Sequence, residues 1–374
     1  MKFTDCIEIV GSKPTLYEGT KQYVSTGAVE EYFINEKSIE EYSYKERPSR
    51  ADLVGKSGDI LFAKMAETKK TLILDKETEN YLFSTGFFAI RPKNGILTTK
   101  CLYYLLNSKN FLSQKDKNSS GATQKAITNA GLEKINVNIP LFSKQDQIVK
   151  QFDLLTDIIK KYQSQLKKLD SLIKSRFIEM FGNPQCISNN WKVNPLSDYC
   201  IVNPKKSELG PIPDDYELSF IPMQSVSENG DVDTSSIKHY KDVKTGFTYF
   251  RENDVLFAKI TPCMENGKGG VARKLKNQIG FGSTEFHVLR PIETISNSEW
   301  IYRLTTFKTF RKDAENNMTG SAGQRRTPKE FFDKYKVGLP PIELQNDFAT
   351  FVQQIDKSKF EMEKIVKLCY TTLM

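Results

Sequence analysis

Two short loops of similar sequence carry side chains that can recognise the bases and phosphates of nucleic acid. Their polar members are Gln124 and Lys125 in the first loop, and Gln324, Arg325, Arg326 and Thr327 in the second. Glutamine can pair with adenine through two hydrogen bonds, arginine can do so with guanine, and either cation can hold a phosphate. These residue types predict a nucleic-acid contact, although ordinary solvated loops also contain them.

A second set of cations follows two short apolar runs that both end in Phe-Ala-Lys. Its members are Lys64, Lys69 and Lys70 in the first half of the chain, and Lys259, Lys268 and Arg273 in the second. Cations that flank a strand in this way can follow the phosphates of a nucleic-acid backbone. The alternative is that they are surface residues that serve solubility.

The sequence lacks the patterns that catalytic sites require. It contains no G-x-x-x-x-G-K-[ST] phosphate loop, no Asn-Pro-Pro-Tyr or Asp-Pro-Pro-Tyr run for gripping a base, no nuclease cluster of two acids and a lysine, and no serine nucleophile elbow. The histidines are His239 and His287, and the six cysteines form no C-x-x-C pair. We therefore expect a non-catalytic chain with no cofactor or metal site of its own.

The two halves of the chain repeat each other in residue type and in order. Gly58–Lys64 returns as Asn253–Lys259, Ser84–Pro92 returns as Ser283–Pro291, and Gly121–Lys125 returns loosely as Ser321–Arg325. Matching positions are offset by 254 − 59 = 195, 284 − 85 = 199 and 324 − 124 = 200 residues. Because the order is kept and the offset drifts little, the pattern indicates a tandem duplication with short insertions.

Each half ends in a long segment whose apolar residues recur at alternating steps of four and three. The first series is Ile148, Phe152, Leu155, Ile159, Tyr162, Leu166, Leu169, Ile173 and Phe177; the second is Phe348, Val352, Ile355, Met362, Val366, Cys369 and Leu373, with Lys359 as one polar member. Such heptad seams predict long helices over residues 144–181 and 343–374 that each need a partner helix.

The two long segments begin alike, with Gln145 and Gln345 at equivalent places, and Gly182-Asn183-Pro184 predicts the end of the first. We expect the helices to pack antiparallel as a spacer between two globular parts. The alternative is that they are ordinary core helices.

Within each half, short apolar runs bounded by Gly, Asn and Pro predict strands, and residues 99–112 and 298–312 predict amphipathic helices. The expected fold is α+β, with two tandem-repeated α+β domains separated by two long antiparallel coiled-coil helices. The expected boundaries are 1–142 for the first domain, 143–183 for the first long helix, 184–341 for the second domain and 342–374 for the second long helix.

The composition is that of a globular chain with a mild excess of positive charge. The 374 residues have a formal net charge of +8, which is compatible with a polyanionic partner. We find no signal peptide and no apolar segment long enough to span a membrane, and we expect a cytoplasmic protein.

In these motifs the chain resembles the specificity (S) subunits of type I restriction–modification systems over essentially its whole length. The resemblance is carried by Trp191-Lys192 with Leu196-Ser197-Asp198, the run from Asp254 to Lys268, Ser283–Phe286 with Arg290-Pro291, and Leu339-Pro340-Pro341-Ile342 followed by Gln345. The first half departs from this pattern, because it lacks the Trp-Lys opening and has Met65-Ala66-Glu67 where the second half has Ile-Thr-Pro.

The resemblance implies a role in phage defence. Each globular part is expected to be a target recognition domain that reads one half of a bipartite, asymmetric site in double-stranded DNA, with the helices setting the spacer. Two methyltransferase (M) subunits are expected to dock on the chain and to carry S-adenosylmethionine and adenine methylation. Restriction (R) subunits are expected to add ATP- and Mg-dependent cleavage.

Two other functions remain open from the sequence. One is the specificity half of a type II-like methylase–nuclease, which requires the catalytic motifs that are missing here. The other is a coiled-coil adaptor with no role in DNA binding, which predicts no salt-dependent affinity for DNA.

Overall fold

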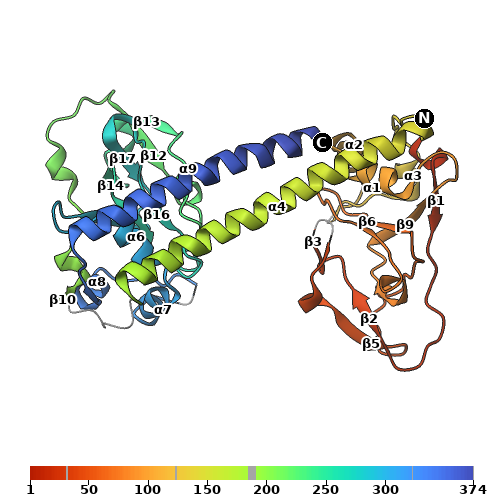
Figure 1. The fold of residues 1–374 in the computed structure, drawn as a ribbon, viewed down its shortest axis with the longest axis horizontal. Helices are drawn as coiled ribbons and strands as arrows, with labels where there is room; N and C mark the ends of the chain where they lie inside the picture. Colours follow the sequence, from red (N-terminus) through yellow and green to blue (C-terminus); the bar gives the residue numbers. More distant parts are fainter. Residues whose placement is uncertain (31–32, 123, 184–190, 322, 374) are drawn as a thin grey trace. The chain divides into compact units, whose positions relative to one another are not determined.

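The computed structural model describes residues 1–30, 33–122, 124–183, 191–321 and 323–373 (Figure 1). Thr123 and Ala322 of the two repeated loops, Pro184 after the first long segment and the side chain of Leu373 lie outside the described part. The chain divides into two compact units. The first contains Met1–Gln163 together with the residues from Glu363 onward, and the second contains Ser164–Met362.

The first unit is built around an antiparallel sheet with the strands in the order β1 (Ile7–Val10), β9 (Phe87–Pro92), β6 (Ile60–Ala63) and β7 (Thr71–Ile73). The central strand β6 is buried along its whole length. Ile60 and Phe62 face one apolar cluster and Leu61 and Ala63 face another, because side chains alternate along a strand.

Smaller elements cover the two faces of this sheet. A second sheet has the order β5 (Glu40–Ser43), β2 (Thr20–Val24), β8 (Leu82–Phe83), and β3 (Val29–Glu30) pairs with β4 (Phe33–Ile34). The short helices are α1 (Thr99–Asn107), α2 (Lys109–Lys117) and α3 (Asn129–Leu132). The cluster that contains Phe62 includes Leu102 and Leu106 of α1 and Phe111 of α2.

The second unit repeats this plan. Its main sheet has the order β11 (Cys200–Val202), β18 (Phe286–Pro291), β15 (Val255–Ala258), β16 (Gly269–Val271), and its smaller sheet has the order β13 (Ile237–His239), β12 (Glu217–Ile221), β17 (Ile279–Gly282), β14 (Thr248–Arg251). The remaining elements are the pair β10 (Val193–Pro195) and β19 (Lys336–Gly338), and the helices α5 (Tyr240–Val243), α6 (Ser298–Thr306), α7 (Lys308–Asn316) and α8 (Glu330–Lys334). The predicted duplicated α+β fold is confirmed.

Two long helices, α4 (Phe142–Phe181) and α9 (Ile342–Leu373), carry the heptad seams. In the second unit, Phe177 of α4 packs on Phe348 of α9 at 5.5 Å between ring centroids, and Lys359 pairs with Asp170 at 2.7 Å. Between these two contacts the residue number increases along α9 from 348 to 359 and decreases along α4 from 177 to 170, so the helices are antiparallel. The same ion pair explains why the seam tolerates Lys359. In the first unit, the Gln163 amide donates to the Tyr370 hydroxyl at 3.1 Å.

The prediction of one helix over residues 99–112 and one over 298–312 is wrong in both units. Each is two helices that break at Ser108 or at Phe307, whose backbones are extended. Ser108 caps α2, because its hydroxyl accepts a hydrogen bond from Phe111 N at 3.3 Å. Phe307 instead packs against Phe177 of α4. Apolar periodicity continues across both breaks, which is why it did not reveal them.

Candidate nucleic-acid interface

The loop that carries Gln124 and Lys125 is held against the end of strand β6 by backbone hydrogen bonds. Lys64 N donates to Gly86 O at 2.8 Å, and Ile127 N donates to Lys64 O at 2.8 Å. The residue after β6 therefore ties together the start of β9 and the predicted loop. Both Gln124 and Lys125 are exposed.

The second unit makes the same two hydrogen bonds at the end of strand β15. Lys259 N donates to Glu285 O at 2.9 Å, and Thr327 N donates to Lys259 O at 2.9 Å. The loop with the exposed Gln324 consequently lies at the place equivalent to the first loop. The sequence repeat is thus a repeat of backbone contacts around each candidate site.

An ion pair between a buried aspartate and an arginine joins the central strands in both units. Asp59 accepts from Arg91 Nε at 2.8 Å and Nη2 at 2.5 Å, and Asp254 accepts from Arg290 Nε at 2.8 Å and Nη2 at 2.7 Å. Both aspartates are 1% exposed. They occupy positions that repeat in the sequence, but their structural role is visible only in the fold.

Gln145 and Gln345 tie the long helices to the two globular parts. Each amide is completely buried, accepts from one backbone N–H and donates to two backbone carbonyls. The partners are Thr98 N, Ile96 O and Pro140 O for the first, and Asn297 N, Ile295 O and Pro340 O for the second. The equivalence of the two glutamines that the sequence indicated is therefore an equivalence of three hydrogen bonds.

The side chains of the second loop have different surroundings. Arg325 Nη2 donates to Glu315 O at 2.8 Å. Thr327 is 1% exposed, and its hydroxyl has no hydrogen-bond partner among the described residues. The side chain of Thr327 therefore lies out of reach of a ligand in this structure. Its backbone N–H holds the loop in place by donating to Lys259 O.

Arg326 is held by a bidentate ion pair. Its Nε and Nη2 donate to the two carboxylate oxygens of Glu285, each at 2.9 Å, and its Nη1 donates to Gln324 O at 3.1 Å. Hydrogen bonding from Arg326 lowers the pKa of Glu285 below its ordinary value. The guanidinium is thus fixed in orientation while 42% of the side chain stays exposed.

Three of the cations predicted to contact phosphates are already paired within the protein. Lys64 Nζ donates to Thr85 O at 2.8 Å, and Lys70 Nζ donates to Thr26 O at 2.8 Å. Arg273 pairs with the buried Glu299 at 2.8 Å. These three side chains brace the ends of β6, β7 and β16.

Lys259 and Lys268 are half-buried, and among the described residues their ammonium groups have no hydrogen-bond or ion-pair partner. Burial lowers the pKa of Lys259, while nearby Glu285 raises it. The energetic cost of leaving these cations unpaired would fall if an anion approached them.

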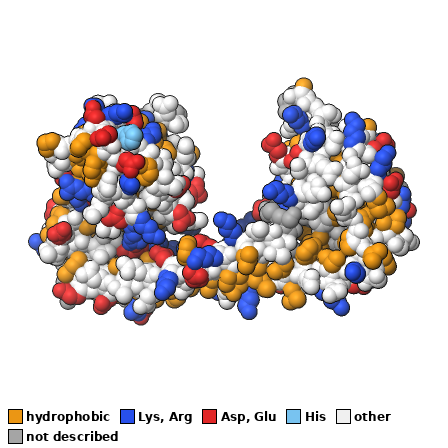
Figure 2. All heavy atoms as spheres, turned by 90° about the horizontal axis from the view of Figure 1, so that it is seen from above, with side chains coloured by type: hydrophobic (Ala, Val, Ile, Leu, Met, Phe, Trp, Pro, Cys, Tyr) orange, Lys and Arg blue, Asp and Glu red, His pale blue; other side chains and the backbone are white. Residues whose placement is uncertain are grey.

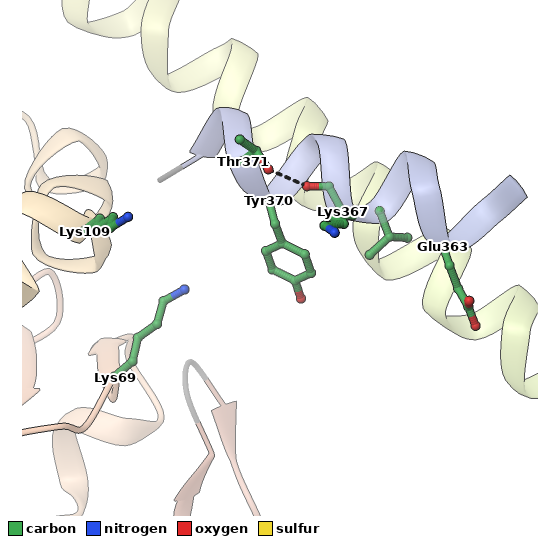
Figure 3. Close-up of a pocket in the computed structure, with 7 residues that line it drawn as sticks. Lys69, Lys109, Glu363, Lys367, Tyr370 and Thr371 are labelled. Carbon is green, nitrogen blue, oxygen red and sulfur yellow. Dashed lines mark hydrogen bonds between the residues drawn. The ribbon is translucent and has the colours of Figure 1, made fainter. Parts of the chain in front are cut away.

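Lys69 lines a cavity of about 740 Å³ in the first unit (Figure 3). Lys109, the first residue of α2, and Lys367 of α9 line the same cavity, together with Glu363 and Tyr370. In the described structure none of the three ammonium groups has a hydrogen-bond or ion-pair partner. The sequence did not reveal Lys109 and Lys367 as candidates, since they lie on separate helices far from Lys69 in the chain.

Two buried cations that the sequence reasoning missed support the loops after the central strands. Lys115, 1% exposed, donates to Met65 O at 2.8 Å and Thr68 O at 2.7 Å. Arg311 donates to Thr305 O, Met264 O and Gly267 O. Burial lowers the pKa of Arg311 to about 10. The available signal was a basic residue four positions after Phe111 or Phe307, on the apolar face of a helix.

No group of three or more His, Cys, Asp or Glu side chains in the described part of the chain could hold a metal ion. No described helix is long and apolar enough to cross a membrane.

The chain matches one family model twice. Residues 8–168 and 188–368 each match the model described as the type I restriction modification DNA specificity domain. Its relatives include the type I restriction enzyme EcoAI specificity subunit of Escherichia coli, 42% identical over 162 residues, and the EcoEI specificity subunit of the same organism, 33% identical over 219 residues. The alignments cover 42% and 58% of this chain but only 27% and 35% of those relatives.

Solved structures share the fold over nearly the whole chain. One is a chain from a structure titled for the complex assembly and conformational transition of the type I R-M system, with a TM-score of 0.57 and 18% identity, covering 98% of this chain and 95% of that chain. Another is the type I restriction-modification S subunit of M. genitalium, with a TM-score of 0.52 and 11% identity, covering 100% and 93%. At these identities the likeness concerns the fold.

Proposed function

The chain belongs to the family of type I restriction–modification DNA specificity domains, and from this membership we propose that it is the non-catalytic DNA-recognition subunit of a type I restriction–modification complex. The observation that carries the proposal is the pair of polar loops, held by equivalent backbone hydrogen bonds in the two units. Two equivalent sites with different side chains suit a bipartite, asymmetric DNA sequence.

We assign the parts of the chain to this task as follows. Residues 1–142 and 184–341 are the two target recognition domains, and residues 143–183 and 342–374 are the spacer helices. The antiparallel contacts between α4 and α9 support a ruler whose length sets the distance between half-sites. The two half-sites must lie close to whole helical turns apart if one face of the duplex is read.

The exposed and half-buried residues of the two loops are the candidates for reading bases. Gln124 and Lys125 serve the first half-site, and Gln324, Arg325 and Arg326 serve the second. Changing Gln324, Arg325 and Arg326 together to alanine is expected to relax or abolish the reading of one half-site. An unchanged DNA motif in that variant would remove these residues from the interface.

The cations with unpaired ammonium groups are the candidates for holding phosphates. They are Lys69, with its neighbours Lys109 and Lys367, in the first unit, and Lys259 and Lys268 in the second. Lys64, Lys70 and Arg273 have partners inside the protein, so their role is to position the strands that carry the site.

The long helices offer a surface for the methyltransferase subunits. Apolar side chains gather on the surface of these helices (Figure 2), and Leu154 and Leu368 of the first unit are 63% and 68% exposed. An apolar surface of this kind is typical of a subunit contact. Two M subunits docked on the duplicated chain would supply S-adenosylmethionine and adenine methylation, and R subunits would supply ATP- and Mg-dependent cleavage. Such a complex would act on DNA in the cytoplasm.

The direct test is to map adenine methylation across the genome of a host that expresses this chain with its cognate methyltransferase subunit. The control is a host that expresses the methyltransferase alone. We expect a split motif with a fixed spacer that is present only with this chain. Association of the two proteins without any new motif would favour the adaptor function instead.

A further inference from the structure

One ion pair distinguishes the candidate site of the second unit from that of the first. The backbone of Arg326 forms isolated antiparallel β-bridges with Ile260 and Thr319, and the backbone of Ala126 forms the same bridges with Met65 and Ser120. Arg326 therefore takes the place of an alanine in the first unit. Its partner Glu285 takes the place of Gly86, because Lys259 N and Lys64 N donate to the carbonyls of these two residues.

A side chain at the position of Gly86 would be crowded in the first unit. A Cβ atom built at Gly86 would meet Thr26 Cγ2 at 2.8 Å, which is closer than real Cβ contacts allow. The pair is thus a property of the second site alone, in a framework that the two units otherwise share.

The geometry leaves the arginine with unused donors. A guanidinium has five N–H groups, and Arg326 uses three of them, two on Glu285 and one on Gln324 O. Two N–H groups remain, and the side chain is 42% exposed. Two parallel N–H donors are what a bidentate contact to guanine O6 and N7 requires.

The charge on the pair favours a base edge over a phosphate. The lowered pKa of Glu285 keeps its carboxylate ionised at neutral pH, so it offsets the charge of Arg326. A phosphate gains little from a cation whose charge is already offset and is repelled by the nearby carboxylate. A neutral acceptor edge depends instead on the orientation of the donors, which the ion pair fixes.

We propose that Glu285 is a positioning residue that holds Arg326 as a fixed fork for one guanine of the half-site read by the second unit. The inference rests on the proposed function, because it deepens the role of the second loop. It assigns guanine recognition in this register to one half of the bipartite site, since the first unit has Gly86 and Ala126 at these positions.

The test compares three variants of the full chain with the wild type, each co-expressed with the methyltransferase subunit and checked for assembly with it. Arg326→Lys keeps the charge and loses the fork, and Glu285→Gln weakens the hold on the guanidinium. Glu217→Gln is the matched control, because Glu217 forms an ion pair with Lys276 on the surface of the same unit at 3.0 Å. The readout is the methylated motif, position by position.

We expect Arg326→Lys to reduce discrimination at one guanine of the second half-site by about tenfold or more. Glu285→Gln should relax the same position to a smaller extent, and Glu217→Gln should leave the motif unchanged. A motif that stays unchanged in assembled Arg326→Lys and Glu285→Gln complexes overturns the inference. So does uniform weakening at all positions, which indicates a phosphate contact, or relaxation confined to the first half-site. If the wild-type chain itself yields no bipartite motif, the proposed function fails rather than this inference.

Discussion

Removing the three unpaired ammonium groups around the cavity of the first unit should change how DNA affinity depends on salt. Lys69, Lys109 and Lys367 reach this cavity from three separate segments of the chain (Figure 3). Since these ammonium groups have no partner in the described structure, replacing the lysines by glutamine breaks no hydrogen bond or ion pair. The fold should therefore survive the triple substitution, and the loss should be confined to binding.

The expected magnitude follows from counterion release. Each phosphate contact contributes about 0.9 to the slope of log Kobs against log salt concentration. Three lost contacts flatten that slope by about 2.7, which is three times the contribution of one. When salt rises fourfold, from about 50 to about 200 mM, the advantage of the wild type over the triple variant should shrink about 40-fold.

The assay is equilibrium binding of the assembled complex with its methyltransferase subunits to a duplex that contains the mapped motif, measured over a series of salt concentrations. The matched control replaces Lys76, Lys134 and Lys150, which are exposed lysines of the same unit outside this cavity. Both triple variants lower the net charge by three, and only the first removes the cavity lysines. Equal flattening in both would show an effect of net charge, and an unchanged slope in the cavity variant would refute the assignment of these lysines to phosphates.

Three further predictions concern stability and geometry. His287 is buried, and desolvation lowers its pKa to about 4. Below about pH 6.5 the unfolded chain therefore binds more protons at this position than the folded chain does. The free energy of unfolding should fall by about 2 kcal/mol when the pH is lowered from about 7 to about 5. His287→Phe, which mimics Phe88 at the equivalent position, should remove that dependence in denaturant titrations at the two pH values; a slope equal to that of the wild type would exclude this histidine. Gln345→Leu should lower the free energy of unfolding by about 3 kcal/mol, since three buried backbone groups lose their hydrogen-bond partner. The control Gln353→Leu, on the exposed face of α9, should change the free energy of unfolding little. Equal losses for the two variants in urea titrations would contradict the role of Gln345 as a buried hydrogen-bond partner. Inserting 21 residues of heptad sequence, which is three heptads, after Gln163 and after Met362 should lengthen both long helices by about 31.5 Å. The DNA spacer should then grow by about nine base pairs at about 3.4 Å each, which is close to one turn of the duplex. Methylation mapping that finds the original spacer would rule out the ruler.

The extent to which the site could be predicted depends on the range of the contacts involved. The loops at Gln124 and Gln324 were found because duplication repeats residue types at a nearly constant offset, and repeated chemistry is visible without coordinates. The free or paired state of a cation has no such signature. Lys69 and Lys70 are neighbours in the chain, yet Lys70 donates to Thr26 O, whereas Lys69 lines an open cavity.

The sequence by itself determined the duplicated α+β organisation and the two heptad helices, because periodicity and repetition are local or regular properties of the chain. It also determined that the chain lacks a phosphate loop and a serine nucleophile elbow. Only the tertiary structure decided which charges are available to a ligand. It buried Thr327, joined Arg273 to Glu299, oriented Arg326 on Glu285 and brought Lys109 and Lys367 to the cavity beside Lys69. The physical reason is that the partners of a charged side chain are set by packing between segments that are distant in the chain, and residue types and spacing do not encode those contacts.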